Sequence, residues 1–508
     1  MVAQVLADYR EVTPPQRLTE APGEREYTVQ YKEADFELMQ RVLAEDGYAF
    51  YFSGARLDQL LLVADTAAHP SRAHARLPVV APAQALLGDE DVVQHLAFGP
   101  SLRPGVQIYR DYSFRNHLFH PTATARDDGG FAVVELLGAS EYQEGVLHEQ
   151  GTGDTTLLDE EQQRVKAGIR LTERRSRHQI LTAELSCMLP AGAVLTLDGD
   201  GAPERRDYTV VRAVTLYELG TEDGEERHRQ QHRVECLPQD FPYRPPPPPK
   251  PRIHGLQRAT VIGDQEIDVD EHGRVLVLFQ WDERDQAWRG PPDPFPSTDF
   301  ARRIQAAQDW AGPNRGFVTL PRLGDEVAVA FIDGDPDQPV VVGQLYNGVN
   351  RSALRLPDDR TQSVWRSRSS PDGDGFHEIR FEDKAGAEEL HIEAERLHTR
   401  LVKGSEQIAV GGDRQIDVGG DQTVTIRGDL EVEATNITFE AEGKHIILAD
   451  RTKVESASRS ERTKGAHVIE AGSVTVRAGE IVLQVGGSAI RITSGGIVIQ
   501  GPVVDINP

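Results

Sequence analysis

Near its carboxyl end the chain repeats a short unit with a period of eight residues. The unit recurs three times within residues 408–429, each time as two apolar residues separated by one position and followed by glycine and aspartate. Alternating apolar residues are typical of a strand with one buried face, and glycine followed by aspartate is typical of a tight turn. A strand and a corner copied along an axis predict a β-solenoid.

A unit of eight residues hardly makes a full turn around a core, so one copy leaves its apolar face uncovered. We therefore expect a needle in which several chains wind together. The side chains predicted to form its core are Ile408, Val410, Ile416, Val418, Val424 and Ile426. The glycines predicted at its corners are Gly412, Gly420 and Gly428. A single-chain calcium roll is the alternative, but its repeats have nine residues and a further glycine that is missing here.

The composition argues against several classes of function. A net charge of −26 over 508 residues disfavours nucleic acid and anionic lipid as partners. The sequence contains no apolar run of about 18 residues, so no transmembrane helix is predicted. The first residues also lack the basic start and the apolar stretch of a secretory signal. Two cysteines are too few for a disulfide framework, so we expect synthesis in a reducing cytoplasm.

The region before the needle reads mostly β, with two helical segments. Phe36, Met39 and Leu43 fall on one helical face, and Gly47 is a natural end for that helix. The charged stretch from Glu160 to Arg177 predicts the second helix.

Five consecutive prolines, Pro245–Pro249, predict an extended spacer. The strand patterns that follow it suit a small closed barrel of the oligonucleotide/oligosaccharide-binding (OB) type. Stacking aromatic residues and a basic groove are not evident in this region, so we expect no nucleic-acid binding.

Motifs for catalysis, cofactors and metals are absent from the sequence. His228 and His232 lie four residues apart in a highly charged stretch and are predicted to be solvated. The acidic loop Asp333–Asp337 is similar to a calcium loop, but Gln338 replaces the required glycine. We therefore expect neither an enzyme nor a bound metal or cofactor. A spike that degrades cell walls would need an inserted catalytic domain, and the segment between barrel and needle is too short for one.

Several motifs, in this order, resemble the VgrG family, the spikes of type VI secretion, which are related to the hubs and spikes of contractile phage tails. The resemblance rests on Gln30–Phe36, Glu45–Gly47, Phe241–Pro245, Asp270–Val275, Pro321–Val327, Gly334–Pro339 and Gly375–Glu389. It implies a mainly β fold with hub β-barrels, an OB-fold barrel and a C-terminal trimeric triple-stranded β-helix. The domains expected are a hub region at 1–240, a proline-rich linker at 241–252, an OB barrel at 253–350, a connector at 351–400 and the needle at 401–508.

The resemblance also implies a function, namely a non-enzymatic homotrimer that punctures cells from the tip of an inner tube. The partners it implies are a hexameric inner-tube protein, baseplate components, a PAAR-repeat tip protein, and effector proteins with their adaptors. Such a chain would be made in the cytoplasm without a signal peptide and exported by the apparatus. The alternative is the hub and spike of a contractile phage or a phage-like particle.

The sequence near each end of the chain leads to one further expectation. Exposed strand ends invite aggregation unless they are covered, so a tip protein is expected to dock at Val503, Val504 and Ile506. Members of the family usually have more residues before the block that starts at Gln30. The first hub barrel is therefore expected to be shortened at its amino end.

Overall fold

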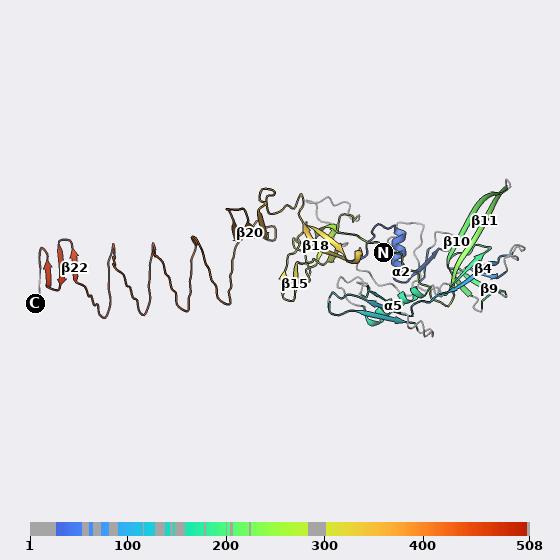
Figure 1. Cartoon of the computed structure of the whole chain (residues 1–508), viewed down its shortest axis with the longest axis horizontal. Coiled ribbons are helices and arrows are strands. Elements are labelled where there is room, and N and C mark those ends of the chain that lie inside the picture. The colour runs from blue at the N-terminus through green and yellow to red at the C-terminus, as the bar shows by residue number, and fades with distance from the viewer. Residues whose placement is uncertain are drawn as a thin grey trace. The chain divides into compact units, whose positions relative to one another are not determined.

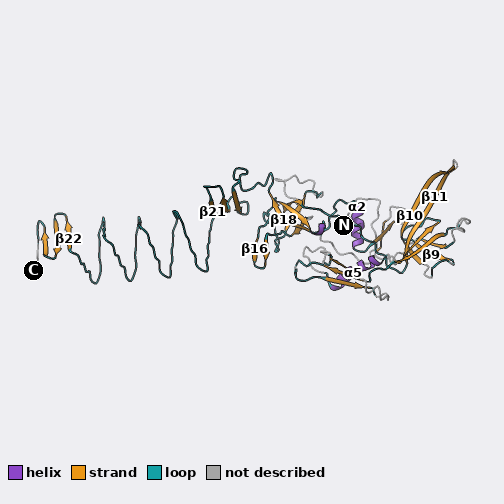
Figure 2. Cartoon of the chain, viewed as in Figure 1, coloured by secondary structure: helices purple, strands orange, loops and turns teal. Residues whose placement is uncertain are grey.

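The computed structural model describes residues 27–504 apart from 53–59, 64–72, 81–89, 115, 128–137, 143–145, 148–157, 177–178, 200, 204–206, 223–224 and 283–300. The chain divides into two compact units, Met1–Leu401 and Val402–Pro508. Among the described residues, strands far outnumber helices in the first unit, and the second unit has strands only near its carboxyl end and no helix (Figure 1, Figure 2). The predicted mainly β fold is confirmed.

The first described helix is α2, Asp35–Glu45, and it packs one apolar face into the hub. The side chains of Leu38, Met39, Val42 and Leu43 are buried, whereas Phe36 is 47% exposed. The predicted face is therefore correct at Met39 and Leu43 and wrong at Phe36, whose ring instead meets Phe50 edge-on. Gly47 follows the helix with φ +79°, a left-handed conformation that favours glycine.

The hub strands form three sheets in the described part of the chain. The six-stranded sheet has the order β3-β9-β10-β11-β8-β4, the three-stranded sheet has the order β6-β5-β7, and β1 pairs with β2. The bounds are β1 Ala49–Phe52, β2 Leu60–Val63, β3 His74–Pro78, β4 Val93–Pro100, β5 Val106–Arg110, β6 Thr122–Arg126, β7 Gly138–Tyr142, β8 Gln179–Leu185, β9 Val194–Asp198, β10 Asp207–Glu222 and β11 Glu225–Pro238.

The second predicted helix is confirmed as α5, Glu160–Arg175. The Asp159 carboxylate caps it by accepting a hydrogen bond of 2.8 Å from the backbone N–H of Gln162. On its inner face Ala167 and Leu171 are buried in one cluster with Tyr109 of β5. The helix therefore covers the β6-β5-β7 sheet.

The two histidines singled out in the sequence lie on β11. His232 is only 6% exposed, and its Nδ1 lies 3.0 Å from the Thr215 hydroxyl of the neighbouring strand. The prediction that His232 is solvated is wrong, because its position on the strand faces the sheet's interior. The side chain of His228 lies outside the described residues.

After the proline run, five strands form a sheet with the order β14-β13-β12-β17-β18. The outer strands meet through a parallel bridge between Ala306 and Val341, where the Val341 N–H donates to the Gln305 carbonyl at 2.9 Å. The sheet therefore closes on itself, which confirms the predicted OB-type barrel. The bounds are β12 Gln257–Ile262, β13 Val275–Phe279, β14 Arg302–Ile304, β17 Glu326–Phe331, the 3-10 helix η4 Ile332–Gly334, and β18 Pro339–Leu345.

The turn before β13 is formed by the motif Asp270–Val275, and its hydrogen bonds explain the residues of that motif. One oxygen of Asp270 accepts from the N–H groups of His272 at 3.0 Å and Arg274 at 2.9 Å, and the other accepts from the Arg274 side chain at 2.6 Å. Gly273 takes φ +71° within this turn. A single carboxylate thus holds the loop that leads into the strand.

Two small β elements complete the first unit. A hairpin pairs β15, Trp310–Gly312, with β16, Arg315–Phe317. A three-stranded antiparallel sheet follows, with β19 Gln362–Arg366, β20 His377–Glu382 and β21 Glu389–Ala394.

The second unit begins without any assigned helix or strand from Val402 to Gly479, all of which is described. Figure 1 shows this stretch as a repeated zigzag. It ends in an antiparallel sheet of β22 Glu480–Val485, β23 Ser488–Thr493 and β24 Gly496–Gln500. Across the described residues of both units, no helix is long and apolar enough to cross a bilayer.

Candidate functional site: a buried polar junction and an uncovered needle segment

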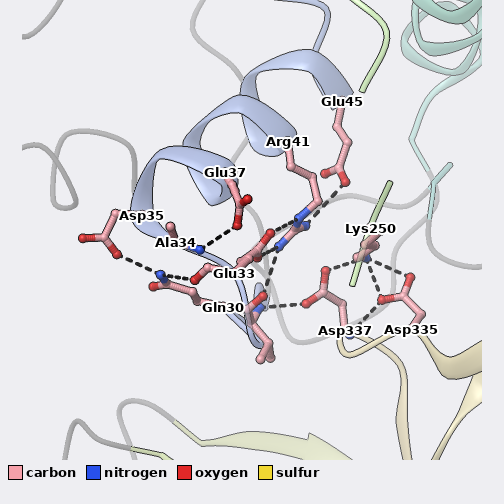
Figure 3. A network of polar contacts seen from close by, with 11 residues as sticks. Gln30, Glu33, Ala34, Asp35, Glu37, Arg41, Glu45, Lys250, Asp335 and Asp337 are labelled. Atoms are coloured by element: carbon pink, nitrogen blue, oxygen red, sulfur yellow. Dashed lines mark hydrogen bonds and ion pairs between the residues drawn. The ribbon is translucent and has the colours of Figure 1, made fainter. Parts of the chain in front are cut away.

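A buried arginine organises the segment before α2. Arg41 is 1% exposed, and its guanidinium donates to the Glu33 carboxylate at 2.6 Å and to the Val29 carbonyl at 3.1 Å (Figure 3). Glu45 lies 3.5 Å from the same guanidinium. Burial alone would lower the pKa of Arg41, but its hydrogen bond to Glu33 and the charge of Glu45 outweigh burial and raise it. The guanidinium therefore stays charged and fixes the strand-like segment at Val29 to the helix.

The same segment is bound to the OB barrel. The Val29 N–H donates to the Asp337 carboxylate at 2.7 Å, and the Lys250 ammonium lies 2.6 Å from Asp337 and 2.6 Å from Asp335 (Figure 3). An edge-on contact between Tyr31 and Trp281, with ring centroids 5.7 Å apart, lies beside this network. We call Val29, Lys250, Asp335 and Asp337 the junction cluster.

Charge explains why the junction cluster needs all its members. Burial raises the pKa of Asp337, while the positive charge of Lys250 opposes that rise. Burial alone would lower the pKa of Lys250, but the charges of Asp337 and Asp335 outweigh it and raise the pKa. Without the lysine, the buried Asp337 carboxylate would lose the cation that lies 2.6 Å from it. Lys250, next to the proline run, thus holds the linker on the same acidic loop of the barrel that Val29 of the hub contacts.

A second polar contact binds the barrel to the segment before β20. Glu266 accepts hydrogen bonds from the side chain of Arg322 at 2.6 Å, from the hydroxyl of Ser370 at 2.9 Å and from the N–H of Asp372 at 3.0 Å. The hydrogen bonds from Asp372 and Ser370 lower the pKa of Glu266. Arg322 belongs to a motif singled out in the sequence, and the structure brings it together with Ser370 on one carboxylate.

A cavity of about 730 Å³ lies between hub and barrel. Several of its charged lining groups are paired, for example Lys166 with Asp46 at 2.9 Å and Arg303 with Asp268 at 2.5 Å. The described residues that line it include no His, Cys or Ser. In the described part of the chain, no three His, Cys, Asp or Glu residues are grouped as a metal site would require.

The needle segment differs from everything before it. Every residue from 402 to 479 is exposed in the single chain. The six side chains predicted to form the core, from Ile408 to Ile426, are between 46% and 68% exposed. Among the described residues, none buries these six side chains. Apolar side chains are stabilised when they are removed from water, so these six have a reason to pack against another chain.

The backbone of the needle segment bends at intervals of seven or eight residues. The regular spacing therefore continues through 440–470, where the sequence pattern is looser, because units of seven alternate there with units of eight. The bends fall at Gly404, Gly412, Gly420, Gly428, Thr435, Gly443, Asp450, Ala457, Gly465, Gly472 and Gly479. The three glycines predicted at corners are among them.

The residues predicted to dock a tip protein lie after β24. Val503 is 84% exposed and Val504 is 45% exposed. Ile506 lies outside the described residues. Sequence reasoning placed these residues by the end of the strand pattern alone, and their role remains a prediction.

Three family models match the chain in order. Residues 1–220 match "Phage tail baseplate hub (GPD)", residues 257–346 match "Type VI secretion system/phage-baseplate injector OB domain", and residues 363–477 match "Bacteriophage T4 gp5 C-terminal trimerisation domain". The boundaries between the matches fall at the proline segment and between β18 and the start of β19.

Curated relatives point the same way. The chain is 30% identical to "Type VI secretion system spike protein VgrG1a" of Pseudomonas aeruginosa, over 78% of this chain and 60% of that protein. It is 31% identical to VgrG1b of the same organism, over 78% of this chain and 52% of that protein. "Actin cross-linking toxin VgrG1" of Vibrio cholerae is 28% identical over 75% of this chain and 34% of the toxin. The chain thus spans less than two thirds of the length of these relatives.

Among solved structures, the E. coli c3393 protein, described as a component of the type VI secretion system, aligns with 19% identity and a TM-score of 0.38. The alignment covers 68% of this chain and 70% of that one. A TM-score this low supports no conclusion about the present chain.

A hub, an injector OB domain and a trimerisation domain in this order define a protein of the phage-tail hub and spike class. Within that class its relatives are VgrG spikes of type VI secretion, so the resemblance predicted from the sequence is confirmed. Most of these relatives are named as spike proteins rather than enzymes.

Proposed function

We propose that this chain is the puncturing spike of a type VI secretion apparatus and acts as a homotrimer without enzymatic activity. The observation that carries the proposal is the needle segment, whose evenly spaced apolar side chains have no cover within the chain. Three interwound copies would bury those side chains along a common axis and pair the backbone groups between chains. The match of residues 363–477 to a trimerisation domain supports the same number of copies.

The proposed mechanism is mechanical. An axial load applied at the hub must reach the needle without bending the joints between domains. The junction cluster supports this role, because Lys250 joins the proline segment to the barrel while Val29 joins the hub to the same acidic loop. Glu266 joins the barrel to the segment that leads to the needle. In each trimer, three copies of both contacts would stiffen the spike.

The partners of the proposed spike follow from this role. The hub would seat on a hexameric inner-tube protein within a baseplate, and a PAAR-repeat protein would cap the blunt end near Val503 and Val504. Effector proteins and their adaptors would travel with that tip. The chain would be made in the cytoplasm, assembled into the apparatus and exported with it.

A secretion assay tests the proposal. In a type VI-competent strain that lacks its own spike gene, this chain should restore release of the hexameric tube protein into the medium. The variant Val424→Asp should abolish release because it places a charge at the proposed axis, while Thr425→Asp, at the next position, should not. Release by Val424→Asp at the wild-type level would contradict the proposed needle.

A binding assay tests the tip. We expect immobilised PAAR-repeat protein to capture the full chain and to lose a chain that lacks residues 501–508. Equal capture of both chains would contradict docking at Val503 and Val504.

A phage-like injection particle is the second candidate, since the model matched by residues 1–220 describes a phage baseplate hub. The names of the relatives favour type VI secretion. The genes beside this one would separate the two candidates, because a phage-like particle would be encoded together with its own fibre or capsid proteins.

A further inference from the structure

The sheet β19-β20-β21 has one apolar face. Register pairs Trp365 with Ile379 and Ile379 with Ile392, and it also pairs Phe381 with Leu390. Residues two apart on a strand share a face, so these five side chains lie together. We call them the apolar face of the connector sheet.

The opposite face of this sheet is charged, and its central residue, Glu378, is buried. Glu378 is 2% exposed and pairs with the guanidinium groups of Arg366 and Arg380. The apolar face is open by contrast, with Phe381 48% exposed and Leu390 60% exposed. An antiparallel sheet with one solvated face normally turns its polar side to water. Here, among the described residues, the apolar face is the more open one, so it is a candidate for contact with a partner.

The open apolar surface continues onto the OB barrel. The ring of Trp365 lies 5.0 Å from that of Phe317, and Phe317 pairs across the β15-β16 hairpin with Trp310. Trp310 is itself 58% exposed. One uninterrupted series of apolar neighbours therefore runs from the barrel hairpin to the edge strand β21.

We propose that the partner is a second and a third copy of this chain, whose connector sheets meet through their apolar faces. The inference rests on the homotrimer proposed above. The match to a trimerisation domain starts at residue 363, so it includes the sheet as well as the needle segment. The sheet also precedes the needle by a few residues of continuous chain, from Ala394 to Val402. An interface between copies at the needle would thus extend directly to these strands.

The contact has a specific task, which is to set the register of the needle. The needle repeats itself every seven or eight residues, so three copies displaced by one unit would still bury similar side chains. The connector sheet is not repeated. Only one alignment brings Trp365, Phe381 and Leu390 of all copies together, and that alignment fixes which repeats face one another.

Photo-crosslinking of the full chain tests the contact. With p-benzoylphenylalanine in place of Phe381, irradiation should yield covalent dimers. The same group in place of His391, on the opposite face of β21, is the matched control and should yield at most a tenth as much dimer. Equal yields from a protein that has the mass of three copies would overturn this inference and leave the proposed spike intact. A mass of one copy would overturn both.

A second measurement tests the register. The photo-reactive group is placed at Thr425, and the linked needle peptides are identified by mass spectrometry. In the otherwise unchanged chain we expect links to one repeat only. With Phe381→Asp added we expect additional links displaced by one repeat, whereas His391→Asp should add none. A single, undisplaced set of links in both variants, from trimers of normal mass, would overturn the role in register.

Discussion

Replacing Lys250 by methionine tests how strongly the junction cluster couples hub to barrel. The substitution keeps a long aliphatic side chain and removes the charge that lies 2.6 Å from both Asp335 and Asp337. Asp337 is 8% exposed, so its charge would be left buried without a cation. Breaking a buried ion pair by removing one partner costs about 3–5 kcal/mol. Because the Lys250 side chain is 25% exposed, we expect the lower end of that range, about 3 kcal/mol.

Hydrogen exchange at Val29 measures this effect directly, since its N–H donates to Asp337. A loss of about 3 kcal/mol corresponds to about 100-fold weaker protection of this amide. The control is Arg258→Met, which removes the ion pair with Glu326. The Arg258 side chain is 74% exposed, so we expect the free energy of unfolding to change by less than about 1 kcal/mol. Protection of Val29 that is the same in both variants would refute the coupling role of Lys250.

The effect of Lys250→Met should depend on pH. Burial raises the pKa of Asp337, and without the opposing charge of Lys250 that pKa rises further. A carboxyl group with a raised pKa in the folded chain stabilises the fold below its unfolded pKa, and this contribution is lost as the pH rises through the folded pKa. The difference in protection between variant and wild type should therefore grow as the pH increases from about 4 to neutrality. A deficit that shrinks over this range would contradict the explanation.

Two further substitutions test local features by thermal unfolding and by mass. Gly47→Ala should lower the unfolding temperature and reduce the free energy of unfolding by about 1–3 kcal/mol, because Gly47 has φ +79° and a Cβ would lie 2.7 Å from Ile169. Gly168→Ala, within α5 and with open space at the Cβ, should instead stabilise by about 0.5–1 kcal/mol, and an equal loss in both would contradict this reading. Val424→Asp should release monomers in light scattering by burying a charge at an apolar axis at a cost of about 3 kcal/mol or more per copy, whereas Thr425→Asp should remain assembled.

The elements that were predictable from the sequence are those set by local pattern. The turn at Asp270 and Gly273 was predictable because one carboxylate and one glycine fix it within five residues. The helix α5 was predictable because its charged surface and capping residues lie within one continuous segment. The OB barrel followed from the spacing of its strands.

The contacts that were missed join residues distant in the chain. Lys250 was read only as part of a spacer, because nothing local shows that it meets Asp335 and Asp337 more than 80 positions later. The signal available was a lysine after the prolines and an acidic loop without a calcium ligand set. The connector sheet was missed for a different reason. Its alternation is visible at Ile379 and Phe381, but only the burial of Glu378 shows which face the chain covers.

The mass of the full chain in solution tests the central claim most directly. A single chain has a mass of 56.1 kDa. Light scattering coupled to size exclusion should give three times that value. It should do so even at the lowest measurable protein concentration, since we expect a single copy of the needle segment not to fold without its partners. A well-folded particle with the mass of one chain would contradict the account.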